Sequence, residues 1–185
     1  MEHTAAGGAG AGGQTYIADP GVRIGHVHLK VADLERAIAF YSGILGLTVT
    51  QRVGSSAAFL AAGGYHHHIG LNTWESLGGS LPPAGSTGLY HTAILYPRRA
   101  ALAAAFRRVL AARIPLDGAA DHGVSEALYL RDPDDNGVEL YWDRPQPEWP
   151  RHADGSLAMF TRLLDLHDLL REPPALALGT GPRDL

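Results

Sequence analysis

Residues 22–31 have the sequence VRIGHVHLKV, and residues 88–96 have the sequence GLYHTAILY. Both stretches are rich in apolar and β-branched residues and contain no proline, which predicts two strands. A histidine lies near the start of each strand, His26 in the first and His91 in the second. The same pattern at two places in one chain indicates an internal repeat.

Each of these strands is followed by a predicted helix. After the first strand, Asp33 can cap a helix that ends at Gly46. Its apolar positions recur at helical spacing and are Leu34, Ile38, Tyr41 and Leu45. After the second strand, residues 98–113 form a helix rich in Ala, Arg and Leu. Its expected inward positions are Leu102, Phe106, Val109 and Leu110.

Three short strands follow each helix. In the first half they are predicted at 47–53, 57–62 and 67–74, and in the second half at about 115–119, 126–132 and 137–142. The last two are joined by DPDDNG, a run of turn-favouring residues. The order βαβββ therefore occurs twice. We predict an α+β fold in which two βαβββ modules pair into a mixed β-sheet half-barrel around a cleft.

The rest of the sequence sets the limits of these modules. We predict a flexible tail at 1–20, the first module at 21–75 and a Gly-, Pro- and Ser-rich linker at 76–87. The second module then covers 88–145, and a C-terminal extension covers 146–185, with a disordered end.

The composition excludes several classes of function. The chain has 185 residues, a formal net charge of −4 and no basic block, so neither nucleic acid nor an anionic membrane is an expected partner. No apolar run could span a bilayer and no leader pattern is seen, so we expect a cytoplasmic protein. The absence of cysteine excludes disulfides and thiolate ligands. By contrast, the ten histidines are candidate metal ligands and proton carriers.

The repeat singles out one set of candidate metal ligands. His26 and His91 occupy the same position in the two modules, and Glu139 lies in the last predicted strand. Two imidazoles and one carboxylate form the facial triad of non-haem Fe(II) enzymes, which leaves coordination positions open for substrate and dioxygen. A lone histidine in a strand is more often a hydrogen-bonded bystander. The matching repeat positions favour the ligand interpretation.

The chain also resembles the vicinal oxygen chelate superfamily. The opening module of that superfamily is similar to residues 25–47, GHVHLKVADLERAIAFYSGILGL, and its closing module to residues 121–145, DHGVSEALYLRDPDDNGVELYWDRP. Together with GGYHHHIGLNTW at 63–74, these segments resemble extradiol ring-cleaving dioxygenases of the catechol 2,3-dioxygenase type. The resemblance covers about residues 22–172. It implies the vicinal oxygen chelate fold and cleavage of a catechol-type aromatic by dioxygen.

The resemblance implies a metal and a role for individual residues. The expected metal is Fe(II), with Mn(II) or another divalent ion as alternatives. The metal ligands correspond to His26, His91 and Glu139. His67 corresponds to an acid and base that handles protons during oxygen activation. His122 and Tyr129 correspond to groups that hydrogen-bond the substrate oxygens, although the loop between them is shorter than in the larger enzymes.

Two further histidines are candidates for the substrate pocket, His28 and His68. His28 shares a strand face with His26, so it either lines the pocket or lies as a polar residue between layers. His66, His67 and His68 alternate in direction, so all three cannot point into one site. The sequence leaves open which of the three faces it.

Two other functions of the superfamily are alternatives. A glyoxalase-like isomerase or lyase binds its metal with a carboxylate from the last strand of each module, but the repeat maps that position in the first module onto Gly70. A non-catalytic drug-binding protein generally lacks the ligand set. Both arguments favour the dioxygenase, with a catechol and dioxygen as partners. The two-module chain is also compatible with a homodimer.

Overall fold

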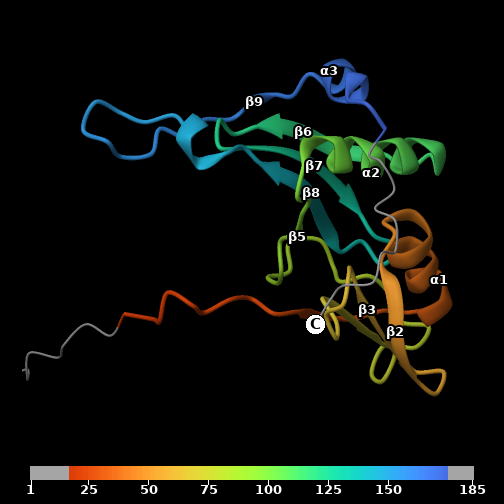
Figure 1. Ribbon diagram of the computed structural model, residues 1–185. Helices are drawn as coiled ribbons and strands as arrows, with labels where there is room; N and C mark the ends of the chain where they lie inside the picture. Colours follow the sequence, from red (N-terminus) through yellow and green to blue (C-terminus); the bar gives the residue numbers. More distant parts are fainter. Residues whose placement is uncertain (1–16, 175–185) are drawn as a thin grey trace, which may run out of the picture.

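The computed structural model describes residues 17–174, which form two β-sheets with helices packed against them (Figure 1). The first sheet has the strand order β1-β4-β3-β2 and the second β5-β8-β7-β6-β9. The strands of the first sheet are β1 (Val27–Lys30), β2 (Thr48–Val53), β3 (Ala57–Ala61) and β4 (Ile69–Asn72). Those of the second are β5 (Thr92–Leu95), β6 (Leu116–Asp121), β7 (Ser125–Arg131), β8 (Gly137–Asp143) and β9 (Arg162–Leu163). The predicted α+β fold is confirmed.

Some predicted features lie outside residues 17–174. They are most of the N-terminal tail and the disordered end of the C-terminal extension. Within the described residues, no helix is long and apolar enough to cross a membrane.

The two sheets share one pairing pattern. β1 runs parallel to β4 and β5 runs parallel to β8, whereas the other pairs are antiparallel. His28 lies opposite Gly70 in the first sheet, and Ala93 lies opposite Glu139 in the second. The register therefore places Gly70 at the position equivalent to Glu139, as the sequence repeat predicted.

Several strands are shorter than predicted. β1 begins at Val27 and β5 at Thr92, so His26 and His91 each lie directly before a strand. β4 begins at Ile69, so His67 and His68 also precede their strand. The candidate site residues on these segments therefore lie at strand ends, where backbone position is less tied to the ladder.

The first predicted helix is only partly α-helical. α1 (Leu34–Ile38) begins as expected, with the Asp33 side chain accepting a hydrogen bond of 3.0 Å from the Arg36 backbone nitrogen. It continues as a π-helix, η1 (Ala39–Ile44), which apolar spacing over so short a segment does not distinguish from an α-helix. The four predicted inward residues are buried, and Gly46 follows the helix with a φ of +85°.

The second helix, α2 (Arg99–Ala111), matches its prediction except at one position. Leu102, Phe106 and Val109 are buried, but Leu110 is 47% exposed. With 3.6 residues per turn, Leu110 lies about 100° around the helix from Val109 and points away from the core.

One hydrophobic core joins the two modules. It contains Leu60 and Leu71 from the first sheet and Leu128 and Leu140 from the second, with the helices between them. The buried Tyr41 hydroxyl also donates a 3.0 Å hydrogen bond across the modules to Asp132. Because side chains alternate along a strand, the neighbours of Leu128 and Leu140 face the opposite side of the sheet. That side carries the candidate site.

The C-terminal extension returns to the second module. After η2 (Gln146–Glu148), the chain forms an isolated bridge between Arg151 and Leu157. β9 then pairs with β6, and α3 (Leu166–Arg171) packs against α2 with Leu169 fully buried (Figure 1). The extension thus covers the outer edge of the second sheet.

Candidate active site

The second sheet carries a chain of polar contacts through four predicted site residues. Nε2 of His91 lies 2.9 Å from Oε2 of Glu139. The Tyr129 hydroxyl donates to Oε1 of Glu139 at 3.2 Å, and Nε2 of His122 lies 2.8 Å from that hydroxyl. Tyr129 on β7 and Glu139 on β8 are direct cross-strand partners. We refer to His91, Glu139, Tyr129 and His122 as the polar chain.

His122 links the Tyr129 hydroxyl to the C-terminal extension. The Tyr129 hydroxyl donates its one proton to Glu139, and its oxygen lies 2.8 Å from Nε2 of His122. Nδ1 of His122 lies 3.2 Å from the Thr161 hydroxyl and 3.3 Å from the Phe160 carbonyl oxygen. Burial, and then the charge of Glu139, raises the pKa of Tyr129 to about 12. Tyr129 is therefore a protonated donor at neutral pH.

Gly137 explains how His91 comes so close to Glu139. A Cβ at this first residue of β8 would lie 2.1 Å from the Tyr90 carbonyl oxygen and 3.0 Å from the His91 Cβ. Any side chain at this position would push the segment before β5 away from β8. The glycine comes from the predicted DPDDNG turn, so the turn also serves the site.

A cavity of about 280 Å³ adjoins the polar chain. The residues around it include Tyr90, His91, Gly118, Tyr129, Arg131 and Gly137. Two of these are glycines, which leave room for a flat ligand. The Arg131 guanidinium is held to one side by Asp117 at 2.7 Å. His91 and Tyr129 therefore supply polar groups to a small cavity.

The first sheet carries a different arrangement, which we call the aromatic cluster. It consists of His26, His28, Phe59, His67 and Trp74. The ring centroids of His26 and His67 are 4.3 Å apart, and those of His67 and Phe59 are 4.9 Å apart. Burial, and then neighbouring His26, lowers the pKa of His67, which favours its neutral form.

His28 lies in the same cluster, above a glycine. Its ring centroid is 5.9 Å from that of Phe59 and 5.5 Å from that of Trp74. A Cβ at Gly70 would lie 3.0 Å from two atoms of the His28 ring. Gly70 stands where the equivalent position of the second module has a carboxylate, and it therefore leaves room for the His28 imidazole.

The structure separates the three consecutive histidines. His67 is partly buried against His26, whereas His66 and His68 are exposed and lie against Tyr65. His68 and His26 also line a second cavity, of about 290 Å³, beside β5.

The residues present fit a divalent metal at two of the three predicted ligands. Bonds from such a metal to nitrogen or oxygen are about 2.0–2.2 Å long, so two ligands of one ion lie roughly 3 Å apart. The 2.9 Å separation between His91 and Glu139 matches this value. However, among residues 17–174 no group of three His, Cys, Asp or Glu side chains is arranged to hold an ion. His26 lies against His67 instead, and its role as third ligand stays a prediction.

The family is decided by comparison with known proteins. Residues 23–140 match the model of the Glyoxalase/Bleomycin resistance protein/Dioxygenase superfamily. The chain belongs to this superfamily. It is 40% identical over 150 residues to the catechol-2,3-dioxygenase of Bacillus subtilis (strain 168), an alignment that covers 80% of this chain and 51% of that protein. It is also 33% identical over 128 residues to biphenyl-2,3-diol 1,2-dioxygenase 3 of Rhodococcus globerulus, covering 65% of this chain and 63% of that protein.

The superfamily match and the fold agree. A glyoxalase/dioxygenase from Nostoc punctiforme has a similar crystal structure, with a TM-score of 0.57 at 19% identity, over 72% of this chain and 100% of that chain. The resemblance of residues 25–47, 63–74 and 121–145 to the superfamily is thereby confirmed. This superfamily member spans between half and two thirds of the length of the curated relatives that it matches.

Sequence reasoning missed the contacts that support His122. Thr161 and Phe160 of the C-terminal extension contact its ring, and Arg144, directly after β8, pairs with Asp121 beside it. No local motif marks these contacts, since they join segments that are far apart in the sequence. Gly137 belongs to the predicted DPDDNG turn, but that pattern does not predict its close approach to the Tyr90 carbonyl.

Proposed function

We propose that this superfamily member is an extradiol dioxygenase, which cleaves the ring of a catechol-type aromatic with dioxygen. The observation that carries the proposal is the polar chain, in which two candidate metal ligands, His91 and Glu139, lie beside the Tyr129 hydroxyl. The 40% identity to a catechol-2,3-dioxygenase supports the same reaction type. Because the chain spans about half of that relative, its activity and substrate are part of the proposal.

We assign the metal to His91 and Glu139, with His26 as the third ligand. A bound divalent metal, Fe(II) or else Mn(II), would supply chelation of two adjacent catechol oxygens and electron transfer to dioxygen. Tyr129 holds Oε1 of Glu139, which leaves Oε2 directed toward His91. The protein thus orients its carboxylate ligand through an outer hydrogen bond.

The remaining histidines and Tyr129 manage protons and orient the substrate. Tyr129 keeps its hydroxyl proton at neutral pH, and Nε2 of His122 lies beside it, so both can contact the substrate oxygens. We assign the role of acid and base to His67, which packs against His26 in the first module. His28 and His68 are the candidates for further substrate contacts on that side.

The cavity beside His91 favours a small substrate. Its volume of about 280 Å³ is at the low end of the range for ligand pockets. Gly118 and Gly137 contribute no side chain to its lining. We therefore expect a catechol with one ring to be used better than one that carries a second aromatic ring.

Metal analysis and oxygen uptake test the proposed function. Protein purified without oxygen should contain stoichiometric iron or manganese, and it should consume oxygen with at least one catechol while a yellow ring-opened product forms. Bound metal without oxygen uptake on any catechol would overturn the dioxygenase. It would instead favour another metal-dependent reaction on the same scaffold.

The isomerase or lyase alternative is disfavoured by Gly70. This residue stands where a second carboxylate ligand would be needed, and the His28 ring fills the space above it. A non-catalytic binding role does not account for the polar chain. Binding of a small molecule alone does not require the side chains of His91 and Glu139 to lie 2.9 Å apart, the separation expected of two ligands of one metal ion.

A further inference from the structure

His122 lies in a tight turn that has little freedom of its own. The turn connects β6 and β7, and the His122 backbone nitrogen donates to the Ser125 carbonyl at 2.9 Å. Gly123 has a φ of +79°, and a Cβ there would lie 2.7 Å from Phe160 and 2.8 Å from Pro150. The C-terminal extension therefore presses on the turn from outside, and glycine is required where they meet.

One guanidinium binds the two strands that lead into and out of this turn. Arg144 donates from Nη1 and Nη2 to the carboxylate of Asp121, at 2.7 and 3.2 Å, and from Nη2 to Glu126 at 2.9 Å. Asp121 in turn accepts from the Gly123 backbone nitrogen at 2.8 Å. Burial alone would raise the pKa of Asp121, but the bonds from Arg144 and Gly123 outweigh it and keep the pKa below its usual value.

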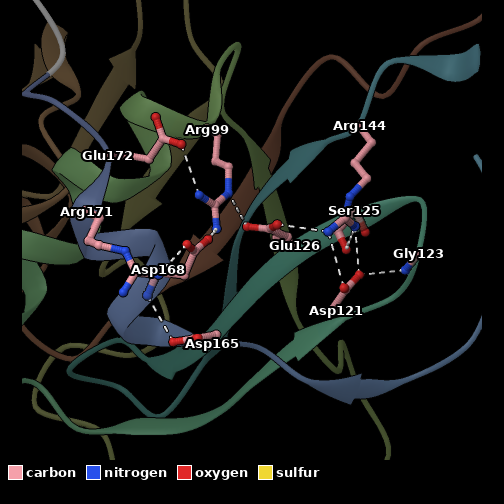
Figure 2. Close-up of polar contacts among 10 residues, drawn as sticks. All are labelled: Arg99, Asp121, Gly123, Ser125, Glu126, Arg144, Asp165, Asp168, Arg171 and Glu172. Carbon is pink, nitrogen blue, oxygen red and sulfur yellow. Dashed lines mark hydrogen bonds and ion pairs between the residues drawn. The ribbon is translucent and has the colours of Figure 1, made fainter. Parts of the chain in front are cut away.

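The same contacts continue to the C-terminal helix (Figure 2). Arg99, at the start of α2, donates to Glu126 at 2.7 Å, to Asp168 at 2.8 Å and to Glu172 at 2.9 Å. Glu126 is only 5% exposed, so both of its oxygens depend on these two arginines. The resulting ion-pair network, made of Asp121, Arg144, Glu126, Arg99, Asp168 and Glu172, joins the His122 turn to α2 and α3.

Within the polar chain, Tyr129 and Glu139 lie on strands and His91 directly precedes β5, whereas His122 lies in the turn between β6 and β7. Its ring makes one short contact, with Tyr129, and two longer ones with Thr161 and Phe160. Its orientation therefore follows the backbone of the turn. On one side of His122 the backbone is held by the bonds of Asp121, and on the other by the close packing of Gly123 against the C-terminal extension.

We propose that Asp121 and Arg144 are positioning residues, which hold the His122 turn so that Nε2 of His122 meets Tyr129. The inference rests on the dioxygenase function proposed above. The Asp121–Arg144 ion pair is partly buried, and Asp121 also accepts from Gly123, so we expect the pair to restrain the turn more than to add net stability. Displacement of a catalytic contact by about 1 Å is enough to slow an enzyme on the order of 100-fold.

Asp121→Asn is the sharpest probe, because the amide oxygen can still accept from Gly123 while the ion pair with Arg144 is lost. We expect kcat to fall about tenfold with metal content unchanged. Arg144→Lys, which keeps the charge but not the two-pronged contact, should act in the same direction. The matched control is Glu35→Gln, which breaks the exposed ion pair of Glu35 with Arg52 in the first module and should leave kcat unchanged.

A double-mutant cycle separates positioning from a structural effect. In a His122→Ala background, Asp121→Asn should cause no further loss of the residual turnover. An equal loss in both backgrounds would overturn the proposal, since Asp121 would then act independently of His122.

Imidazole nitrogen NMR gives a readout that does not require activity. The His122 resonances, assigned by their loss in His122→Ala, should shift or broaden in Asp121→Asn and Arg144→Lys. Unchanged His122 resonances would overturn the proposal. If the wild type consumes no oxygen with any catechol but these resonances still move, the dioxygenase assignment fails and the positioning of His122 stands.

Discussion

The two modules share one strand order, yet they present different surfaces on the faces away from the core. In the second module, hydrogen bonds join His122, Tyr129 and Glu139, and His91 lies 2.9 Å from Glu139. The ion-pair network lies directly behind the His122 turn. In the first module, the aromatic cluster is held by ring packing, and His26 and His28 are exposed. Hydrogen bonds and ion pairs therefore orient the side chains on the surface of the second module, whereas ring packing orients those of the first.

Gly70 and Glu139 show how the repeat produced this difference. They occupy equivalent register positions opposite β1 and β5. Glu139 supplies a carboxylate that two neighbours orient, whereas Gly70 supplies no side chain and lets the His28 ring lie over the strand. The same register position thus carries a carboxylate in the second module and leaves room for an imidazole ring in the first.

The largest effect should come from removing the donor at this position. Glu139→Gln replaces a charged ligand with a neutral amide, so we expect metal content to fall severely and turnover to fall at least 100-fold. Elemental analysis and oxygen uptake measure the two quantities. Glu35→Gln, an exposed change of the same kind, should leave both intact. Full metal content and activity in Glu139→Gln would show that the second module does not hold the metal.

Next in size is the loss of the acid and base expected from the first module. His67→Phe keeps a ring against His26 and Phe59 but removes both nitrogens, so metal content should be retained while oxygen-dependent turnover falls about 100-fold. Stopped-flow oxygen consumption at saturating catechol measures this step. His152→Phe, at an exposed position in the extension, is the control. Wild-type turnover in His67→Phe would show that His67 is not the acid and base and that the first module only lines the pocket.

A smaller effect should follow from interrupting the polar chain itself. Tyr129→Phe leaves Oε1 of Glu139 without its donor and His122 without its partner, so we expect metal to be held about tenfold more weakly. Competition with a chelator measures the affinity. Tyr65→Phe, which also removes a phenolic hydroxyl but in the first module, should not change it. An unaltered metal affinity in Tyr129→Phe would show that the Glu139 carboxylate does not need the hydrogen bond from Tyr129 to bind the metal.

The sequence predicted the fold well because the βαβββ order repeats. Apolar spacing located both helices, and the turn residues located the hairpins. It did not predict the π-helical half of the first helix or the exposure of Leu110, since apolar residues at helical spacing do not report hydrogen-bond register or the limit of the buried face.

The candidate site was predictable to a more limited extent. Repeat positions led to His91 and Glu139, which the structure brings to 2.9 Å, and the spacing of Tyr129 from Glu139 matches their cross-strand pairing. His26 was selected by the same repeat but lies against His67. The support behind His122 was not predictable, because Arg144, Arg99 and α3 come together only through tertiary packing.

The smallest effect probes the space that Gly70 provides. A Cβ in Gly70→Ala would lie 3.0 Å from the His28 ring, which is flanked by Phe59 and Trp74. Alanine also reduces the entropy of the unfolded chain, which favours the variant where there is room. We expect the packing conflict to prevail, with the free energy of unfolding lower by roughly 1 kcal/mol in urea titrations.

The cause of that loss can be isolated by removing the neighbour. In a His28→Ala background, the same Gly70→Ala change should be neutral or slightly stabilising, because the clash is gone and only the entropic gain remains. Equal destabilisation in both backgrounds would show that Gly70 is needed by the strand itself rather than by His28. Glycine at position 70 would then not be explained by the aromatic cluster. The only difference from Glu139 would be that the first module lacks a carboxylate at this position.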